Sequence, residues 1–586
     1  MHKSNFKKNA SEILITLIGT ISIFPFVTRS ITSIKNGIEN LSPALDVYYY
    51  QRVFNLDNNL FQLGDIYVDS RSFEQRQINT LSIGELLQKF FYHLFDDNII
   101  ITYFIFSFLL LFAWIFLIAR LITYDYPESF LKNIFVTTVM LLIFVGNTNL
   151  INSNYPFARI MSPQISIFLG LISLILINKI LKVRASKTPA YKYIIQFSLL
   201  IFVASFTYLY TFLSLFGTGL VVILFLATQK KYIYLVWFTI FILISIFPFV
   251  IINYIKSKEE RFKDAGERMG LIKSHYPGSL TTIIICAIIM FSLLSYKYFL
   301  TKKDPYSNIE LALMASSTGL FLASQSNIVT GTEIQFYHFN LFAKINLMLF
   351  LILVINRIKF KKIQNQFSFF GIILIALLST TLILHSLNKI ILPLLFDNKI
   401  NTSVELLKNK YNSETKLIVD VVNLQNTFPV YSYAKLLYQS DITTYGYTNR
   451  EILERAYISA GCPSEISGSL KLELEVYRAE ATYMKGKALE KYLKLFSLDK
   501  YFASSYKSKL DAAFKERSLI QSEINNYLIA VNKNSCISMA NKYEIDSIIF
   551  DEKSHWRIIT KNEGLPINSF TFQGKSLYEY NLRKAI

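Results

Sequence analysis

The chain has 586 residues, of which 52% are hydrophobic and only 17% are charged, a composition too apolar for an ordinary soluble protein. Three cysteines in so long a chain exclude a disulfide-rich scaffold. The formal net charge of +19 is compatible with nucleic-acid binding, but the basic residues gather in loops between apolar runs instead of forming a stripe in a soluble domain. We therefore expect no nucleic-acid partner.

The N-terminus is short and basic, and an apolar run at 13–27 follows it. A cleaved signal peptide would end in a small-x-small site, which Thr28-Arg29-Ser30 matches poorly. We therefore expect this run to be retained as the first membrane span. A long polar loop, 31–98, comes next.

Further apolar runs fill the chain as far as residue 386, and most reach the ~20 residues that ~30 Å of hydrocarbon requires. The expected spans are 99–122, 130–150, 164–181, 193–212, 214–228, 232–255, 279–300, 309–329, 339–357 and 367–386. The run 214–228 is short enough to be re-entrant. The sequence predicts an α-helical polytopic membrane protein of about eleven transmembrane helices, in a domain covering 1–396.

Basic residues alternate between the junctions of these spans, which gives the orientation. One side carries Lys3, Lys7, Lys8, Arg120, Lys179, Lys182, Arg184, Lys187, Lys192, Lys230, Lys231, Lys297, Lys302, Lys303, Arg357, Lys359, Lys361 and Lys362. Cytoplasmic loops are rich in Lys and Arg, so we expect this side and the N-terminus to be cytoplasmic. The loop 256–278, placed outside, is charged and fits the pattern less well. The loop 31–98 and the C-terminal tail then lie outside the cytoplasmic membrane.

The tail, 397–586, is long enough for a core of its own, and we expect an extracytoplasmic α/β domain with a helical insertion. Strands are predicted at 416–422 and 546–550, with a third over 556–559. Helical patterns occupy 429–438, 449–460, 468–496 and 503–532. Cys462 and Cys536 both fall in this tail, where an oxidising compartment would allow one disulfide, and the sequence leaves open whether it forms. Cys286 lies inside a span and is expected only to pack.

The outer loop 31–98 has an unusual local composition. It contains Asp46-Val-Tyr-Tyr-Tyr50, which includes Tyr49, and Gln51 and Arg52 follow. A carboxylate near the membrane surface can act as a general base on a hydroxyl. Tyrosine offers an apolar face with a polar end, which suits sugar rings and equally suits an interfacial aromatic belt.

These residues and the layout around them resemble the GT-C superfamily of membrane glycosyltransferases. The shared layout is a first span, a long outer loop with an early acid, many further spans and an outer C-terminal domain. The segments Asp46-Val-Tyr-Tyr-Tyr50, Asn154-Tyr-Pro-Phe-Ala-Arg159-Ile-Met-Ser-Pro163 and Thr332-Glu-Ile-Gln-Phe-Tyr-His338 look like short segments of that superfamily. The resemblance implies transfer of a sugar from a polyprenyl-phosphate donor to a glycan, lipid or protein acceptor, with inversion at the anomeric carbon.

The resemblance implies that Asp46 would deprotonate the acceptor hydroxyl. The leaving phosphate needs a cation, for which Arg has the best shape, and the candidates are Arg159 and Arg52, followed by Arg261 and Arg268. Glu333 and His338 would bind a sugar or assist proton transfer, or would simply form a polar turn. Lys344 lies inside a span, where a charge is a candidate site residue by default, although it can also snorkel to the surface.

No metal-ligand motif, Walker loop or nucleophile elbow stands in the sequence. Asp46 is followed by Val47 where the superfamily carries a second acid, so no metal site is assigned and a divalent cation is left open. The segment Tyr124-Asp125-Tyr126 echoes the Asp46 segment but falls in a predicted cytoplasmic loop. The alternative functions are a lipid-linked polysaccharide polymerase or ligase and a membrane transporter, which would show inverted repeats that we do not see.

Overall fold

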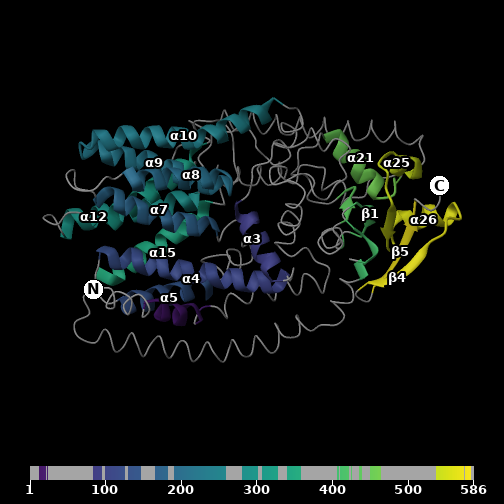
Figure 1. Ribbon diagram of the computed structural model, residues 1–586, viewed down its shortest axis with the longest axis horizontal. Helices are drawn as coiled ribbons and strands as arrows, with labels where there is room; N and C mark the ends of the chain where they lie inside the picture. The colour runs from purple at the N-terminus through teal and green to yellow at the C-terminus, as the bar shows by residue number, and fades with distance from the viewer. Residues whose placement is uncertain are drawn as a thin grey trace, which may run out of the picture.

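A computed structural model describes two parts of the chain, a helical bundle and a small α/β module (Figure 1). The described residues are 12–21, 23, 83–95, 99–125, 130–146, 165–182, 191–258, 280–300, 307–326, 339–357, 406–407, 409–412, 414–421, 424, 434–438, 449–463, 536–572 and 575–582. The expected span at 367–386 and the helical patterns at 468–496 and 503–532 lie outside these ranges. So do all of the expected site residues except Lys344.

The bundle is built from apolar helices at the positions that hydropathy predicts. They are helix 12–21, α4 (Ile99–Asp125), α5 (Phe130–Gly146), α7 (Ile165–Lys182), α8 (Tyr191–Ser205), α9 (Leu209–Thr228), α10 (Tyr232–Ser257), α12 (Leu280–Leu300), α13 (Asn308–Ser324) and α15 (Phe339–Arg357). Three segments of them are long and apolar enough to cross a membrane: Ile105–Thr123, Leu209–Thr228 and Tyr232–Ile251. The apolar segments of the other described helices are shorter, such as Thr281–Ser295 in α12, and the count of eleven spans stays a prediction.

Helix α9 corrects one expectation of the sequence analysis. The segment predicted as a short, re-entrant run at 214–228 belongs to a continuous helix of 20 residues, Leu209–Thr228. The preceding helix α8 ends at Ser205 rather than at 212. The polar residues that hid the true boundary, Ser205 and Thr207, donate side-chain hydrogen bonds to the backbone carbonyls of Phe202 and Val203, which closes the turn.

Contacts between helix ends follow the alternation expected of neighbouring spans. The Lys231 ammonium, before α10, donates to the carbonyl of Leu181 at the end of α7 at 3.3 Å. Asn133, at the start of α5, donates to Thr123 near the end of α4 at 2.8 Å. All four residues lie at ends that the basic residues assign to the same side.

At the opposite ends of the helices, residues predicted to lie on the same side are also in contact. Thr282 at the start of α12 donates to the Asn340 side chain at the start of α15 at 2.8 Å. The rings of Tyr210, at the start of α9, and Phe339 meet edge to face with centroids 5.3 Å apart. These four residues lie in the first turns of helices that, by the charge pattern, begin on the predicted non-cytoplasmic side.

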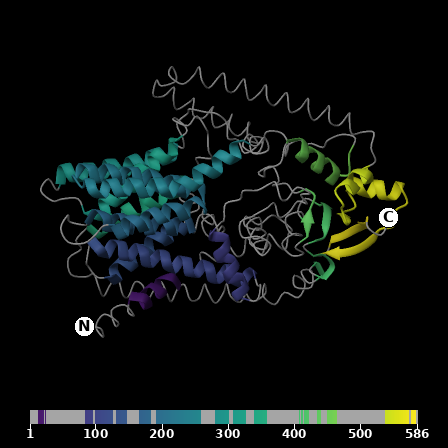
Figure 2. The same cartoon turned by 45° about the horizontal axis from the view of Figure 1, so that its top comes forward.

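Helix α3 (Ile83–Leu94) falls within the loop that the sequence analysis treated as a polar connection. It ends just before α4, and the rings of Phe91 and Phe106 lie 5.0 Å apart between the two helices. Figure 1 shows α3 turned across the direction of the bundle helices, at the end of the bundle that faces the module, and Figure 2 shows it at the same end.

The module is a five-stranded mixed sheet in the order β2-β1-β3-β5-β4. Its elements are β1 (Lys416–Asp420), β2 (Lys435–Leu436), α21 (Asn449–Ser459), α25 (Cys536–Lys542), β3 (Ser547–Phe550), α26 (His555–Asn562), β4 (Asn568–Phe572) and β5 (Lys575–Asn581). Strands β2, β1 and β3 are parallel, and β5 and β4 add an antiparallel hairpin at one edge. In register, Ile418 pairs with Ile548 and Ile548 with Tyr580.

Two local predictions for the tail are wrong. The expected third strand at 556–559 lies in helix α26, because the Ser554 side chain caps the N-terminus by accepting from the Trp556 amide at 3.1 Å. Of the helical run expected at 429–438, the structure describes 434–438, where Lys435 and Leu436 form strand β2 and pair with β1. The strands at 416–420 and 547–550 and the helix at 449–459 are confirmed.

Both faces of the module's sheet are covered. Ile418, Ile548 and Trp556 form the core on one side, and Leu417, Val419 and Ile549 form it on the other. Cys462 and Cys536 are joined in a disulfide, with their Cα atoms 5.8 Å apart, which ties the end of α21 to the start of α25. The pairing that the sequence left open is therefore present.

A buried acid links the hairpin to the segment before β1. Glu579 accepts a hydrogen bond from the Tyr411 hydroxyl at 2.9 Å and pairs with the Lys410 ammonium at 2.5 Å. Burial is the main cause that raises the pKa of Tyr411, and the neighbouring Glu579 carboxylate raises it further. A buried carboxylate is tolerated because both of these partners compensate its desolvation.

Candidate functional site

Of the seven candidate site residues, the structure describes one. Asp46, Tyr49, Arg52, Arg159, Glu333 and His338 lie outside the described residues. Lys344 lies in the second turn of α15 and is half-buried. The candidate site is therefore built from the described bundle and module.

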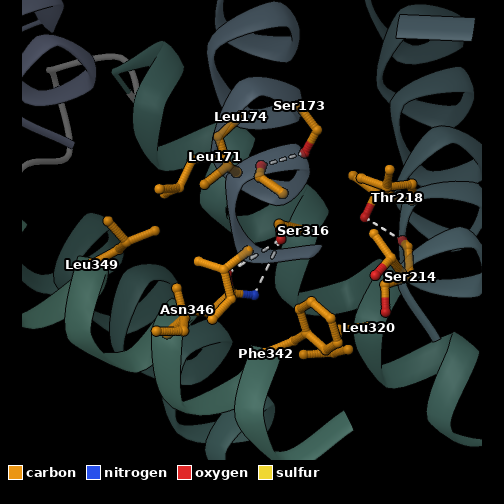
Figure 3. A pocket seen from close by; sticks show the side chains of 15 residues that line it. Leu171, Ser173, Leu174, Ser214, Thr218, Ser316, Leu320, Phe342, Asn346 and Leu349 are labelled. Carbon is orange, nitrogen blue, oxygen red and sulfur yellow. Dashed lines mark hydrogen bonds between the residues drawn. The ribbon is translucent and has the colours of Figure 1, made fainter. Parts of the chain in front are cut away.

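A small cavity lies between four bundle helices, close to Lys344 in the sequence. Its volume is about 40 Å³, and it is lined by residues of α7, α9, α13 and α15 (Figure 3). Apolar side chains such as Leu171, Leu174 and Leu349 share the wall with hydroxyl and amide groups. Lys344 is not among the lining residues, although Ile345 and Asn346 are.

Asn346 is the central polar group of this cavity. Its Nδ2 donates to Ser316 Oγ at 3.1 Å and to Ser317 Oγ at 3.4 Å, and its Oδ1 accepts from Ser316 at 3.3 Å. These bonds join α15 to α13 in the apolar interior, where a polar side chain needs a partner. Figure 3 shows the Asn346 amide directed at Ser316 across the cavity.

The hydroxyl groups along α7 and α9 mostly bond back to their own helices. Ser173 donates to the Gly170 carbonyl at 2.6 Å, Ser214 to Tyr210 at 2.7 Å and Thr218 to Ser214 at 2.7 Å. The Thr211 hydroxyl is buried in the same wall and has no hydrogen-bond partner among the described residues. A cavity of about 40 Å³ holds one to about three waters, so it fits water and not a sugar ring.

Two glycines bring α9 and α13 into backbone contact beside this cavity. A Cβ placed on Gly217 would lie 2.4 Å from the Gly319 carbonyl oxygen, and one on Gly319 would lie 2.2 Å from the Thr218 amide nitrogen. Only glycine permits so close an approach, a common device in helix pairs within membranes. The sequence carried a signal for it, since 315–319 reads Ala-Ser-Ser-Thr-Gly inside an apolar run.

A second group of polar residues lies where the parallel strands of the module end. Asp420 is the last residue of β1, and Asp551 directly follows β3. The Ser554 hydroxyl donates a short hydrogen bond to Asp420, and His555 begins α26 beside it. The carboxyl ends of parallel strands are where open α/β sheets bind ligands.

The surroundings of Asp420 raise the pKa of its carboxyl group. Burial raises the pKa of Asp420 most strongly, and the nearby Asp551 raises it further, while the hydrogen bond from Ser554 and the charge of His555 lower it. No group of three or more metal-ligating side chains occurs in the part of the chain that the structure describes. The sequence analysis passed over this group because Asp420 reads as the end of an apolar strand.

Comparisons with known proteins add no family to these observations. No protein-family model matches the chain, and no curated protein matches it either.

Proposed function

We propose that this protein is a membrane glycosyltransferase of the GT-C type, with about eleven membrane spans. It would move a sugar from a polyprenyl-phosphate donor to a glycan, lipid or protein acceptor outside the cytoplasmic membrane. The observation that carries the proposal is the agreement between charge and contact in the bundle. Helix ends that the alternating topology places on the same side also touch one another, as Lys231 does with Leu181 and Thr282 with Asn340.

This agreement supports an alternating arrangement in which the first long loop and the tail share the non-cytoplasmic side. The Cys462–Cys536 disulfide is a second support, because such bonds persist in oxidising compartments and are rare in the cytosol. A catalytic loop and a soluble module in one compartment are what a transferase acting on external acceptors needs.

The proposed reaction assigns one step to each group. Asp46 takes the proton of the acceptor hydroxyl, whose oxygen attacks the anomeric carbon of the donor sugar. The bond from that carbon to the phosphate oxygen breaks, and polyprenyl phosphate leaves. Arg159 and Arg52 stabilise the charge on the leaving phosphate. Tyr49, Glu333 and His338 hold the sugar, and Lys344 supplies a further cation near the outer ends of the helices.

The cavity at Asn346 supports this proposal by its position. Its lining residues Ile167, Thr211 and Phe342 come from the first turns of α7, α9 and α15, the helix ends that the charge pattern places outside. Polar groups inside an apolar bundle are costly and usually serve a purpose. Hydrated polar groups below the outer surface would help to admit a phosphate-bearing lipid.

The test is a comparison of lipid-linked and cell-surface glycans by mass spectrometry in cells with the intact gene, the deleted gene and the variant Asp46→Asn. Deletion and Asp46→Asn should each remove one sugar from the mature glycan. Asp125→Asn is the matched control, since Asp125 stands in a similar acidic, aromatic segment on the predicted cytoplasmic side, and it should leave the glycan unchanged.

Other outcomes separate the competing functions. Shortened chains made of complete repeats would favour the polymerase or ligase, and unchanged glycans with altered uptake would favour the transporter. Full sugar transfer by Asp46→Asn would contradict the role of Asp46. Cysteine labelling from outside intact cells at positions 46 and 420 checks the shared compartment, and protection of either position would overturn it.

A further inference from the structure

Helix α3 has two faces of opposite character. At 100° per residue, its apolar side chains fall on one side of the helix, and its polar side chains fall on the other. The apolar face carries Leu86, Leu87, Phe90, Phe91 and Leu94. The polar face carries Gln88, Lys89 and Tyr92, and the exposed His93 lies at the boundary between the two faces.

On a soluble protein, an amphipathic helix buries its apolar face and exposes its polar face. In α3 the apolar face is exposed and the polar face is buried. Phe90 is 63% exposed, Leu94 is 58% exposed and Leu87 is 43% exposed. Gln88 and Lys89, on the polar face, are only 1% and 8% exposed. The helix thus turns polar groups toward the protein and a stripe of large apolar groups outward.

In water, this orientation would carry two free-energy costs. Large apolar side chains would be exposed to solvent, and Gln88 and Lys89 would be desolvated. A contiguous exposed apolar stripe on a folded protein marks a surface that contacts something other than water. The same orientation becomes favourable if the outward face meets hydrocarbon. The polar face then keeps its contacts with protein, and Leu87, Phe90 and Leu94 leave the aqueous phase.

The position of α3 identifies lipid as the occupant. The helix ends at Leu94, a few residues before α4, and α4 contains the strongly apolar segment Ile105–Thr123. Phe91 packs on Phe106 at the start of that segment. Leu109 of α4 is also exposed, so the helix that follows α3 presents an apolar side chain outward as well.

The direction of α3 fits the same occupant. Figure 1 shows α3 crossing the axis of the bundle where α4 begins. A helix that lies across the spans at their ends lies in the plane of the membrane surface, where amphipathic helices bury their apolar face at the boundary of headgroups and acyl chains.

We propose that α3 is an interfacial helix that inserts Leu87, Phe90 and Leu94 into the acyl region of the leaflet at which α4 begins. This proposal goes beyond the transferase function and does not depend on it, since it requires only that α4 crosses a bilayer. The partner is the lipid itself, recognised by apolar contact and not by a specific headgroup.

The test uses the full chain in vesicles of phosphatidylethanolamine and phosphatidylglycerol, with a nitroxide spin label on a single introduced cysteine. The background is Cys286→Ala, because Cys462 and Cys536 are joined to each other. Phe90→Cys carries the label on α3. The matched control is Ile558→Cys on α26, an exposed apolar position at 52% exposure in the module.

Molecular oxygen concentrates in lipid, and a charged nickel chelate stays in water, so their collision rates with the label report depth. The ratio of oxygen to nickel accessibility should be several-fold higher at position 90 than at position 558. A label at position 87 or 94 should repeat the result, which guards against a local distortion at position 90.

Two results would overturn the proposal. Equal ratios at positions 90 and 558 would place α3 in water. Low accessibility to both reagents at position 90 would mean that protein, such as a second copy of this chain, covers the stripe. Retention of the Cys462–Cys536 disulfide and a single size-exclusion peak confirm that each labelled protein is folded.

Discussion

The carboxylate of Glu12 lies 2.5 Å from the guanidinium of Arg120, and this ion pair joins the first described helix to the last turns of α4. Glu12 is buried, and Arg120 is about half-exposed. A buried carboxylate needs a partner, which explains why an acid stands at the head of an otherwise apolar helix. The pair also fits the expected topology, since the first span begins, and α4 ends, on the predicted cytoplasmic side.

Arg120→Gln should lower the free energy of unfolding by about 1–3 kcal/mol, since Glu12 would lose its ionic partner in a largely dry site. The measurement is unfolding of the full chain in mixed micelles. The double variant Glu12→Gln/Arg120→Gln should recover most of the loss, because it removes the buried charge as well. Equal loss in the single and double variants would show that the ion pair is not the cause.

Gly319→Ala should destabilise the bundle by about 1–3 kcal/mol, because the new Cβ would overlap the backbone of Thr218, which cannot move aside cheaply. Gly170→Ala is the matched control, since a Cβ at Gly170 meets nothing within 4 Å. That variant should be neutral or stabilising through better helix propensity. The two proteins should separate clearly in a thermal melt, and similar melting points would refute the close crossing of α9 and α13.

Replacing Cys462 and Cys536 together with serine should lower the stability of the module by about 2–4 kcal/mol. The bond closes a long loop, with a sequence separation of 74, so its loss frees many conformations of the unfolded chain. Thiol labelling of the denatured protein gives an independent measurement. One cysteine should react before reduction and three after it, and three reactive thiols before reduction would disprove the bond.

The pH dependence of module stability should reflect Asp420. Because burial raises the pKa of Asp420, the folded state holds this proton at a pH where the unfolded state has lost it. The contribution is complete below the ordinary aspartate pKa of about 3.9. It is lost as the pH rises through the higher folded value. Asp420→Asn should flatten this fall, and an unchanged slope of stability against pH would assign the dependence to other groups.

The sequence predicts the bundle better than the site. Hydropathy locates α4, α10 and α15 within a few residues, because a long apolar run has few alternatives to a helix. It misplaced the boundary between α8 and α9, where the hydroxyl groups of Ser205 and Thr207 bond to nearby backbone carbonyls. It also missed α3, because this helix of 12 residues is too short for a span and stands inside a loop that was read as polar throughout.

The cavity and the glycine crossing depend on which helices are neighbours, and sequence spacing within one helix does not give that. Asn346 and Ser316 lie 30 residues apart and meet only because α13 and α15 pack together. In the module, β1 and β3 were readable as apolar strands. Helix α26 was misread, because the short run at 556–559 fits a strand or a helix equally and the serine cap decided between them.

The Cys462–Cys536 bond has a consequence for insertions and deletions in this chain. The two cysteines are 74 positions apart in the sequence, yet their Cα atoms lie only 5.8 Å apart. The covalent bond holds the end of α21 beside the start of α25 whatever the number of residues between them. A change in that number would therefore leave both attachment points of the sheet's helices in place.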